Sequence, residues 1–155
     1  MQDIGPLIRL LYQRLKAPDG GNLAQLVPRA LGNDQIVPGR SEMAVTKTVV
    51  EPGGGWASDG FLVPHTYLGY IAVHYAADVD QHVTFPDEAA IYRVLETFSG
   101  LPAVQAEPHF RSLGDAPADW FLNTEPTKAG KPPVLTLAFD FALSIDLTLK
   151  EGPPP

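Results

Sequence analysis

The sequence contains no cysteine. Without thiols the chain can form no disulfide, no cysteine nucleophile and no thiolate metal site, and this composition is compatible with a reducing compartment. Apolar runs are short, since none comes near the ~18 residues that a membrane-spanning helix needs. The first residues, MQDIGPLIRLLYQRLK, mix acidic and basic side chains with apolar ones. We therefore expect neither a transmembrane helix nor a secretory signal.

Basic residues are also few. The chain has 11 Lys and Arg against 18 Asp and Glu, which gives a formal net charge of −7. Nucleic acids and anionic membranes bind proteins through a basic face that displaces counterions. No run of Lys or Arg interrupts this acidic sequence. The composition predicts a protein that binds neither nucleic acid nor membrane.

Catalytic motifs are a third absence. No serine lies in a Gly-x-Ser-x-Gly elbow. The glycine-rich segment EPGGGWASDG lacks the Gly-Lys-Ser/Thr of a phosphate loop, and no predicted helix follows it. His65 and His109 each follow a proline, which favours an exposed loop position over a catalytic base. No catalytic residue and no cofactor is predicted, and we expect the chain not to be an enzyme.

One polar segment supports an alternative. Four side chains of the kind that bind metals fall at even positions of HYAADVDQH: His74, Asp78, Asp80 and His82. In an extended chain residues two apart share a face, and two imidazoles with two carboxylates can bind zinc, manganese or iron. The alternative function is thus a small metal-dependent enzyme. If the strand instead ends near Ala77, the carboxylates lie in a solvated turn, so the main expectation is no metal site.

The composition is that of a globular protein. Hydrophobic residues make up 45% and charged residues 19% of the 155-residue chain, which is typical of a protein with its own core. This length is close to the commonest domain size, so we predict a single domain over residues 1–150. Residues 151–155 read EGPPP. They predict a stiff extended tail, because proline has no backbone donor.

Two segments have helical periodicity. In residues 4–17 apolar side chains recur at the i, i+3, i+4, i+7 spacing of an amphipathic helix. Residues 84–100 begin with Thr84 as a candidate N-cap, have acidic residues in the first turn and end at a glycine. We predict a helix over each segment, and only a short helical turn, broken at Pro28, within residues 22–42.

Three segments predict strands. Residues 43–51 are rich in β-branched side chains, and residues 61–77 carry apolar residues on both faces, which is typical of a central strand. Residues 101–133 are rich in proline and lack periodicity, so we expect a long loop with one short strand near residues 104–110. The third strand is residues 134–149. We predict an α+β fold: a mixed or antiparallel sheet with the two main helices on one face and a long C-terminal strand.

This C-terminal strand is unusually regular. In VLTLAFDFALSIDLTL every odd position is a large apolar residue, and the even positions are nearly all small or polar. Its 16 residues would span roughly 50 Å when extended, far more than an ordinary strand. The central AFDFALS contains no Gly, Pro or Asn to make a turn. We therefore expect one strand that bends, crosses between sheets or extends beyond its own domain.

The odd face of this strand is too apolar to remain in water. Either the two helices cover it, as in most α+β sheets, or it forms an interface between copies of the chain. The even face, with Asp140 and Asp146, suits solvent or the polar lumen of a ring. The interface candidates are Phe139, Phe141, Leu143 and Ile145, together with Trp56 and Trp120 elsewhere in the chain.

Two further stretches carry a family resemblance. YLGYIAVHYAADVD followed by PDEAAIYRVLETFSGLPAV is a strand and helix that end in Leu-Pro, and VLTLAFDFALSIDL closes the chain after a Trp-containing loop. In this order of elements, residues 1–149 resemble the tail-terminator, or tail-completion, proteins of long-tailed phages. They are also similar to the cap proteins of contractile injection systems. The loop at residues 52–60 has no counterpart in the resemblance.

The resemblance implies a non-enzymatic subunit of a homo-oligomeric ring, expected to be a hexamer, that terminates or caps a phage-tail-like tube. Its partners would be further copies of itself and the tail tube and sheath proteins. Its location would be the cytoplasm or an assembled phage or phage-tail-like particle. A heterologous ring interface suits both the long strand and the acidic composition. A third possibility is a monomeric ligand-binding domain with its pocket under residues 101–133.

Overall fold

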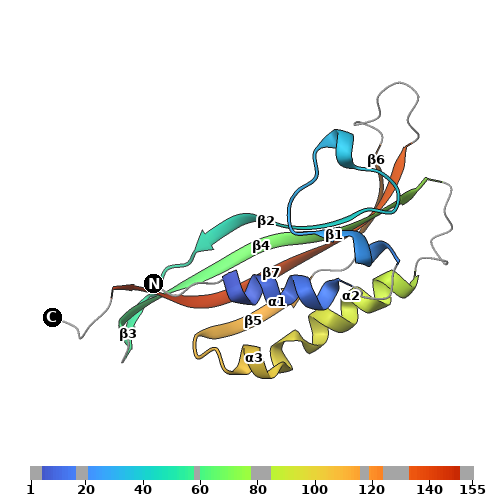
Figure 1. Cartoon of the computed structure of the whole chain (residues 1–155). Coiled ribbons are helices and arrows are strands. Elements are labelled where there is room, and N and C mark those ends of the chain that lie inside the picture. Colours follow the sequence, from blue (N-terminus) through green and yellow to red (C-terminus); the bar gives the residue numbers. More distant parts are fainter. Residues whose placement is uncertain are drawn as a thin grey trace.

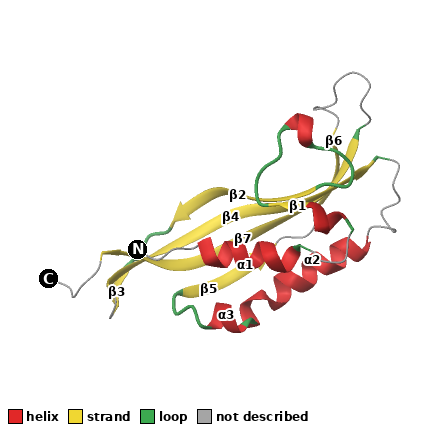
Figure 2. Ribbon diagram, viewed as in Figure 1, coloured by secondary structure: helices red, strands yellow, loops and turns green. Residues whose placement is uncertain are grey.

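The computed structural model of the chain describes residues 5–16, 21–57, 60–77, 85–115, 119–123 and 133–150. It has the predicted α+β fold, in which a mixed sheet carries its α-helices on one face (Figures 1 and 2). Within these ranges no helix is both long and apolar enough to cross a membrane.

Two strands of 17 residues each form the centre of the sheet, β4 (Gly60–Ala76) and β7 (Val134–Lys150). They pair in antiparallel fashion over their whole length, from Phe61 opposite Lys150 to Ala76 opposite Val134. At about 3.3 Å per residue each strand spans roughly 55 Å. The strands predicted over residues 61–77 and 134–149 are therefore confirmed, and β7 needs no turn because β4 accompanies it throughout.

Shorter strands line both sides of this pair. On one side β2 (Ser41–Val50) and then β3 (Gly55–Ala57) pair antiparallel with β4. On the other side β5 (Phe110–Asp115) and then β6 (Asp119–Asn123) pair antiparallel with β7. The two-residue β1 (Leu26–Val27) adds a parallel strand outside β2. The sheet is thus four strand positions wide for most of its length.

The prediction of a long loop over residues 101–133 is wrong in its described part. A short helix, α3 (Pro102–Gln105), comes first, and Val104 is fully buried in it. The strands β5 and β6 follow, and β5 begins at Phe110, where the predicted strand ends. Both strands are short and lack clear alternation, and backbone pairing with β7 is what specifies them. Residues 124–132 lie outside the described part.

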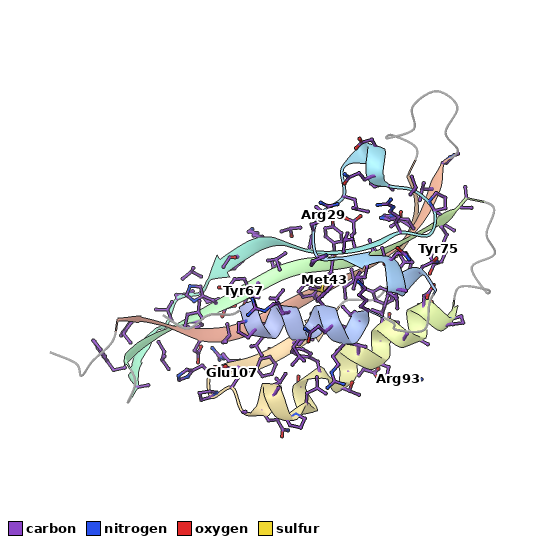
Figure 3. All side chains as sticks on the ribbon, in the orientation of Figure 1. Arg29, Met43, Tyr67, Tyr75, Arg93 and Glu107 are labelled. Carbon is purple, nitrogen blue, oxygen red and sulfur yellow. The ribbon has the colours of Figure 1, made fainter. Side chains whose placement is uncertain are left out.

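Helices cover one face of the sheet (Figure 2). They are α1 (Gly5–Leu15) and α2 (Phe85–Thr97), which continues as the 3₁₀ turn η4 (Phe98–Gly100). Their buried side chains form one core cluster with the odd face of β7, to which Met43 also belongs (Figure 3). Both predicted helices are confirmed, although Thr84, the expected N-cap, lies outside the described residues.

The sheet is much longer than the helix layer. Helices of 11 and 13 residues measure about 17 and 20 Å at 1.5 Å per residue, against roughly 55 Å for β4 and β7. The ends of the sheet extend beyond the helices, most clearly at β3 and at β6 (Figure 1). The helices therefore bury the middle of one face.

A polar contact ties α2 to the sheet at the end of β4. The hydroxyl of Tyr75, which is labelled in Figure 3, donates to Asp87 Oδ2 at 2.5 Å, and Asn22 Nδ2 donates to the same oxygen at 3.5 Å. Burial, then the bond to Asp87, raises the pKa of Tyr75, so its proton stays in place at neutral pH. Asp87 thus links α2 both to β4 and to η1 (Asn22–Gln25). This contact is additional to the favourable interaction with the helix dipole that its position in the first turn predicts.

Gly69 permits the closest approach within the sheet. A Cβ added there would lie against the carbonyl oxygen of Ala44 and 2.6 Å from Cζ of the Phe141 ring, which packs on the glycine. Gly69→Ala is expected to lower the free energy of unfolding by about 1–3 kcal/mol, because the neighbours must shift. Urea denaturation measures this change.

Gly114→Ala is the matched control for Gly69→Ala. Gly114 also lies on a strand, in β5, but a Cβ there would meet nothing within 4 Å. Its substitution should change stability by less than about 0.5 kcal/mol. Equal stabilities of the two variants would contradict the packing of Phe141 on Gly69.

Candidate functional site

The face of the sheet opposite the helices has a hollow near the C-terminal end of β4 and the N-terminal end of β7. Ala72 of β4 and Ala138 of β7 lie directly opposite each other, and two small side chains leave space between their larger neighbours. On β4 those neighbours are Tyr70 and His74, because residues two apart on a strand share a face. On β7 they are Asp140, opposite Tyr70, and Thr136, opposite His74.

Glu42 of β2 completes the site from the third strand. It lies opposite Ala72, which places its carboxylate between Tyr70 and His74. Glu42 Oε2 is 2.8 Å from His74 Nε2, and the other ring nitrogen, Nδ1, is 2.8 Å from Thr136 Oγ1. The hydroxyl of Tyr70 donates to Glu42 Oε1. A continuous polar network therefore crosses β2, β4 and β7.

Residues 28–40 cover this network. They connect β1 to β2 and arch over the face opposite the helices (Figure 1). The Leu31 amide donates to Glu42 Oε1 at 3.3 Å, and backbone bonds join Gly39 N to His74 O and His74 N to Arg40 O, each at 2.9 Å. Gly39 has φ of 89°, a left-handed conformation that glycine adopts without strain.

A pocket of about 340 Å³ remains between this segment and the sheet. Leu31 and Ile36 line it from the covering segment, and the sheet contributes Glu42, Tyr70, Ala72, His74, Thr136, Ala138 and Asp140. Glu42 and His74 are each 3% exposed and Thr136 is 1% exposed, whereas Asp140 is exposed. The polar network thus forms the floor of the pocket, with Asp140 at its mouth.

The hydrogen bonds keep Glu42 ionised. Burial acts to raise the pKa of Glu42, but the bonds from His74, Tyr70 and the Leu31 amide together outweigh it, and the pKa lies below its ordinary value of 4.5. Burial, then the bond to Glu42, raises the pKa of Tyr70, so the phenol keeps its proton and donates it. Among the described residues that line the pocket none is Lys or Arg, and two, Glu42 and Asp140, are acidic.

The order hydroxyl, imidazole, carboxylate in Thr136, His74 and Glu42 is also the order of groups in enzymes that activate a hydroxyl nucleophile. Here Thr136 is only 1% exposed, so its oxygen is poorly placed to attack a substrate. The Glu42 carboxylate also holds Tyr70 and the covering segment. The arrangement is better suited to binding and to holding residues 28–40 than to acyl transfer.

The structure gives the predicted metal ligand His74 a different setting. Both of its ring nitrogens already have partners, Glu42 and Thr136. The other three candidates, Asp78, Asp80 and His82, lie outside the described residues. Within the described ranges no group of three or more His, Cys, Asp or Glu side chains could hold a metal ion. The four-residue site stays a prediction.

The interface candidates on β7 are covered by the helices of the same chain. Phe139, Phe141, Leu143 and Ile145 are at most 2% exposed and belong to the core cluster. In this arrangement they serve the core and present no surface to another copy.

The two tryptophans lie elsewhere. Trp56 on β3 is 38% exposed and packs edge-to-face on Phe61, with 5.3 Å between the ring centroids. Trp120 pairs through its backbone with Leu137, and its side chain is outside the described part. Trp56 is the only one of the six candidates whose side chain is described as exposed.

The other histidines were expected in exposed positions, and His65 contradicts this. It is 8% exposed, and its Nδ1 lies 2.8 Å from the carbonyl oxygen of Val63. Sequence reasoning also missed Glu42, Tyr70 and Thr136 as members of a site. For Thr136 the signal was that polar groups recur at even positions of β7. Glu42 lies on β2 and Tyr70 on β4, and register across the three strands decides which side chains meet.

The Glu42 network predicts an acid-dependent stability. Because its pKa is lowered in the folded chain, the contribution of Glu42 is present above pH 4.5 and is lost as the pH falls through the lower folded-state value. Glu42→Gln should lower the free energy of unfolding at neutral pH by about 1–3 kcal/mol. Its difference from the wild type should shrink in acid, as measured by urea denaturation across pH.

Glu96→Gln, at an exposed position on α2, is the control for Glu42→Gln. It makes the same chemical change and should alter stability by less than about 0.5 kcal/mol. A Glu42→Gln deficit that stays constant down to strong acid would contradict the account of the ionised, hydrogen-bonded carboxylate.

Comparison with known proteins does not add a family to these observations. No family model matches the sequence, and no curated protein does so either.

Proposed function

We propose that this chain is a structural subunit of a homo-oligomeric ring that terminates or caps a phage-tail-like tube. The partners in this proposal are further copies of the chain, six in the expected ring, and the tube and sheath proteins. The family resemblance of the sequence motivates it, and one structural observation supports self-association: the outer edge of β2.

The outer edge of β2 is residues 43–50. β1 pairs with Ser41 and Glu42 alone, and no other described strand lies beyond β2. Val45 is 40% and Val50 59% exposed there, in a segment rich in β-branched residues. A strand with unpaired backbone groups and exposed apolar side chains is a template for pairing with another chain.

Two features of this edge favour one specific partner over indiscriminate aggregation. The register with β4 shifts between Val45 and Lys47, which marks a bulge, and Lys47 adds an exposed charge. Bulges and lysines are the usual means by which edge strands resist unspecific pairing. A partner must therefore fit both the bulge and the charge.

The geometry of the sheet also bears on ring formation. β1 and β2 lie at one edge and β5 and β6 at the opposite edge. If the outer edge of β2 contacts a different surface of the next copy, the contact is heterologous and can close into a ring. If it contacts its own symmetry mate, the product is a dimer. The proposal requires the first arrangement.

The alternative function is a small metal-dependent enzyme that uses His74, Asp78, Asp80 and His82. The pairing of His74 with Glu42 and Thr136 opposes it. Metal content measured on the same purified sample tests it directly.

Light scattering of the purified chain should give a mass several times that of one chain. Replacing the two exposed valines, in the double variant Val45→Lys and Val50→Lys, should shift the particles to single chains. The two added lysines place like charges at the edge and remove apolar contact area from it. Both effects weaken association, by at least about tenfold. The variant should fold, since both side chains are exposed.

The matched control adds the same charge elsewhere. Gln13→Lys with Gln105→Lys alters exposed positions on α1 and α3 and should leave the mass unchanged. A single-chain wild type with stoichiometric metal would contradict the ring proposal and support the enzyme. Assemblies that survive the two valine changes would remove the outer edge of β2 from the interface.

A further inference from the structure

We propose that the pocket beneath residues 28–40 binds a small cationic group, an ammonium or guanidinium on a short apolar stem. This inference goes beyond the ring and does not rest on it. It follows from which hydrogen-bonding capacity the pocket leaves unused, from its charge and from its size.

The unused capacity on the pocket floor is that of acceptors. An ionised carboxylate can accept about four hydrogen bonds, and Glu42 accepts three, from His74, Tyr70 and the Leu31 amide. Tyr70 donates its only hydroxyl proton to Glu42, so toward a ligand its oxygen can act only as an acceptor.

Thr136 is a further source of acceptor capacity on the pocket floor. His74 Nδ1 lies 2.8 Å from Thr136 Oγ1. A hydroxyl oxygen has two lone pairs, so Thr136 Oγ1 keeps at least one of them whether it donates to Nδ1 or accepts from it. The Thr136 oxygen therefore also offers acceptor capacity. A ligand that donates hydrogen bonds is therefore suited to this floor.

The charge of the residues that line the pocket also favours a cationic donor. Glu42 lies at the floor and Asp140 at the mouth, and no Lys or Arg is among the described residues lining the pocket. A buried anion in a low-dielectric setting gains most from a cation that also donates hydrogen bonds. An ammonium offers three such donors and a guanidinium five.

The walls and the volume define the rest of the ligand. Leu31, Ile36, Ala72 and Ala138 supply apolar walls. The volume of about 340 Å³ is near the lower limit of small-molecule pockets, which run from roughly 300 to 1,000 Å³. The pocket therefore suits a group such as an alkylammonium and excludes a large ligand. This chemistry has two possible sources: a free amine, or the side chain of a Lys or Arg from a second copy.

The test is a titration of the ¹⁵N-labelled chain with n-butylammonium, followed by amide chemical shifts. We expect saturable shifts confined to the amides of residues 28–40 and to those of β2, β4 and β7 around Glu42, Ala72 and Ala138. The dissociation constant should be millimolar, as befits so small a ligand. Butyrate and n-butanol, of the same length but anionic or neutral, should bind at least about tenfold more weakly. Equal binding of the three probes, or no saturable shift, would overturn the proposal.

Three variants locate the site without touching the buried network. Ala138→Leu fills the hollow and should weaken n-butylammonium by at least about tenfold. Ala142→Leu makes the same change on the same face, outside the pocket lining, and should weaken it by less than about twofold. Asp140→Asn, at the exposed mouth, should weaken the binding of n-butylammonium a few-fold. Equal affinities in the two leucine variants would place the amine elsewhere and overturn the assignment.

The mass of the protein with and without saturating n-butylammonium separates the two sources. If a side chain of a second copy normally fills the pocket, the added amine should displace it and lower the mass. An unchanged mass with confirmed binding identifies a free amine as the ligand. Both results retain the cationic pocket and differ only in its occupant.

Discussion

The antiparallel pairing of β4 with β7 is the constraint on which the rest of the structure depends. It runs with one register shift from Ala76 opposite Val134 to Phe61 opposite Lys150, so each long strand satisfies the backbone of the other. The strands β2, β3, β5 and β6 each pair directly with one strand of this pair, and β1 pairs with β2. Gly69 is part of the same constraint, because Phe141 packs where any larger residue would put a Cβ. A strand as long as β7 needs a partner of similar length to satisfy its backbone hydrogen bonds, and β4 is that partner.

The two faces of this pair have different roles. On one face the helices cover the odd residues of β7 and form the apolar core with them. On the other, Ala72 and Ala138 create a hollow that Glu42, His74 and Thr136 line with a polar network. Residues 28–40 are held over that hollow by bonds to Glu42 and His74. The edge is a third surface, since β1 protects only the first residues of β2. Core, pocket and candidate interface are thus separate, so a variant can test one without disturbing the others.

Much of the fold could be predicted from the sequence because its signals are local. The strict alternation of residues 134–149 specifies β7, and the spacing of Leu7, Leu11 and Leu15 specifies α1. β5 and β6 could not be predicted, since pairing with β7 rather than their own pattern defines them. The site was equally hidden: only register brings Glu42 to His74 across 32 positions of sequence. His74 was identified as a candidate residue, but for a metal site, because its true neighbours lie on other strands.

Amide hydrogen exchange measured over a range of protein concentrations tests most directly whether this sheet assembles through the outer edge of β2. Slow exchange is expected in β4 and β7 at every concentration, because each protects the other. In residues 43–50 the amides that do not face β4 should exchange rapidly at low concentration. They should become protected as the mass rises above that of one chain. A rising mass with no added protection in residues 43–50 would contradict the account, as would rapid exchange along β4 and β7.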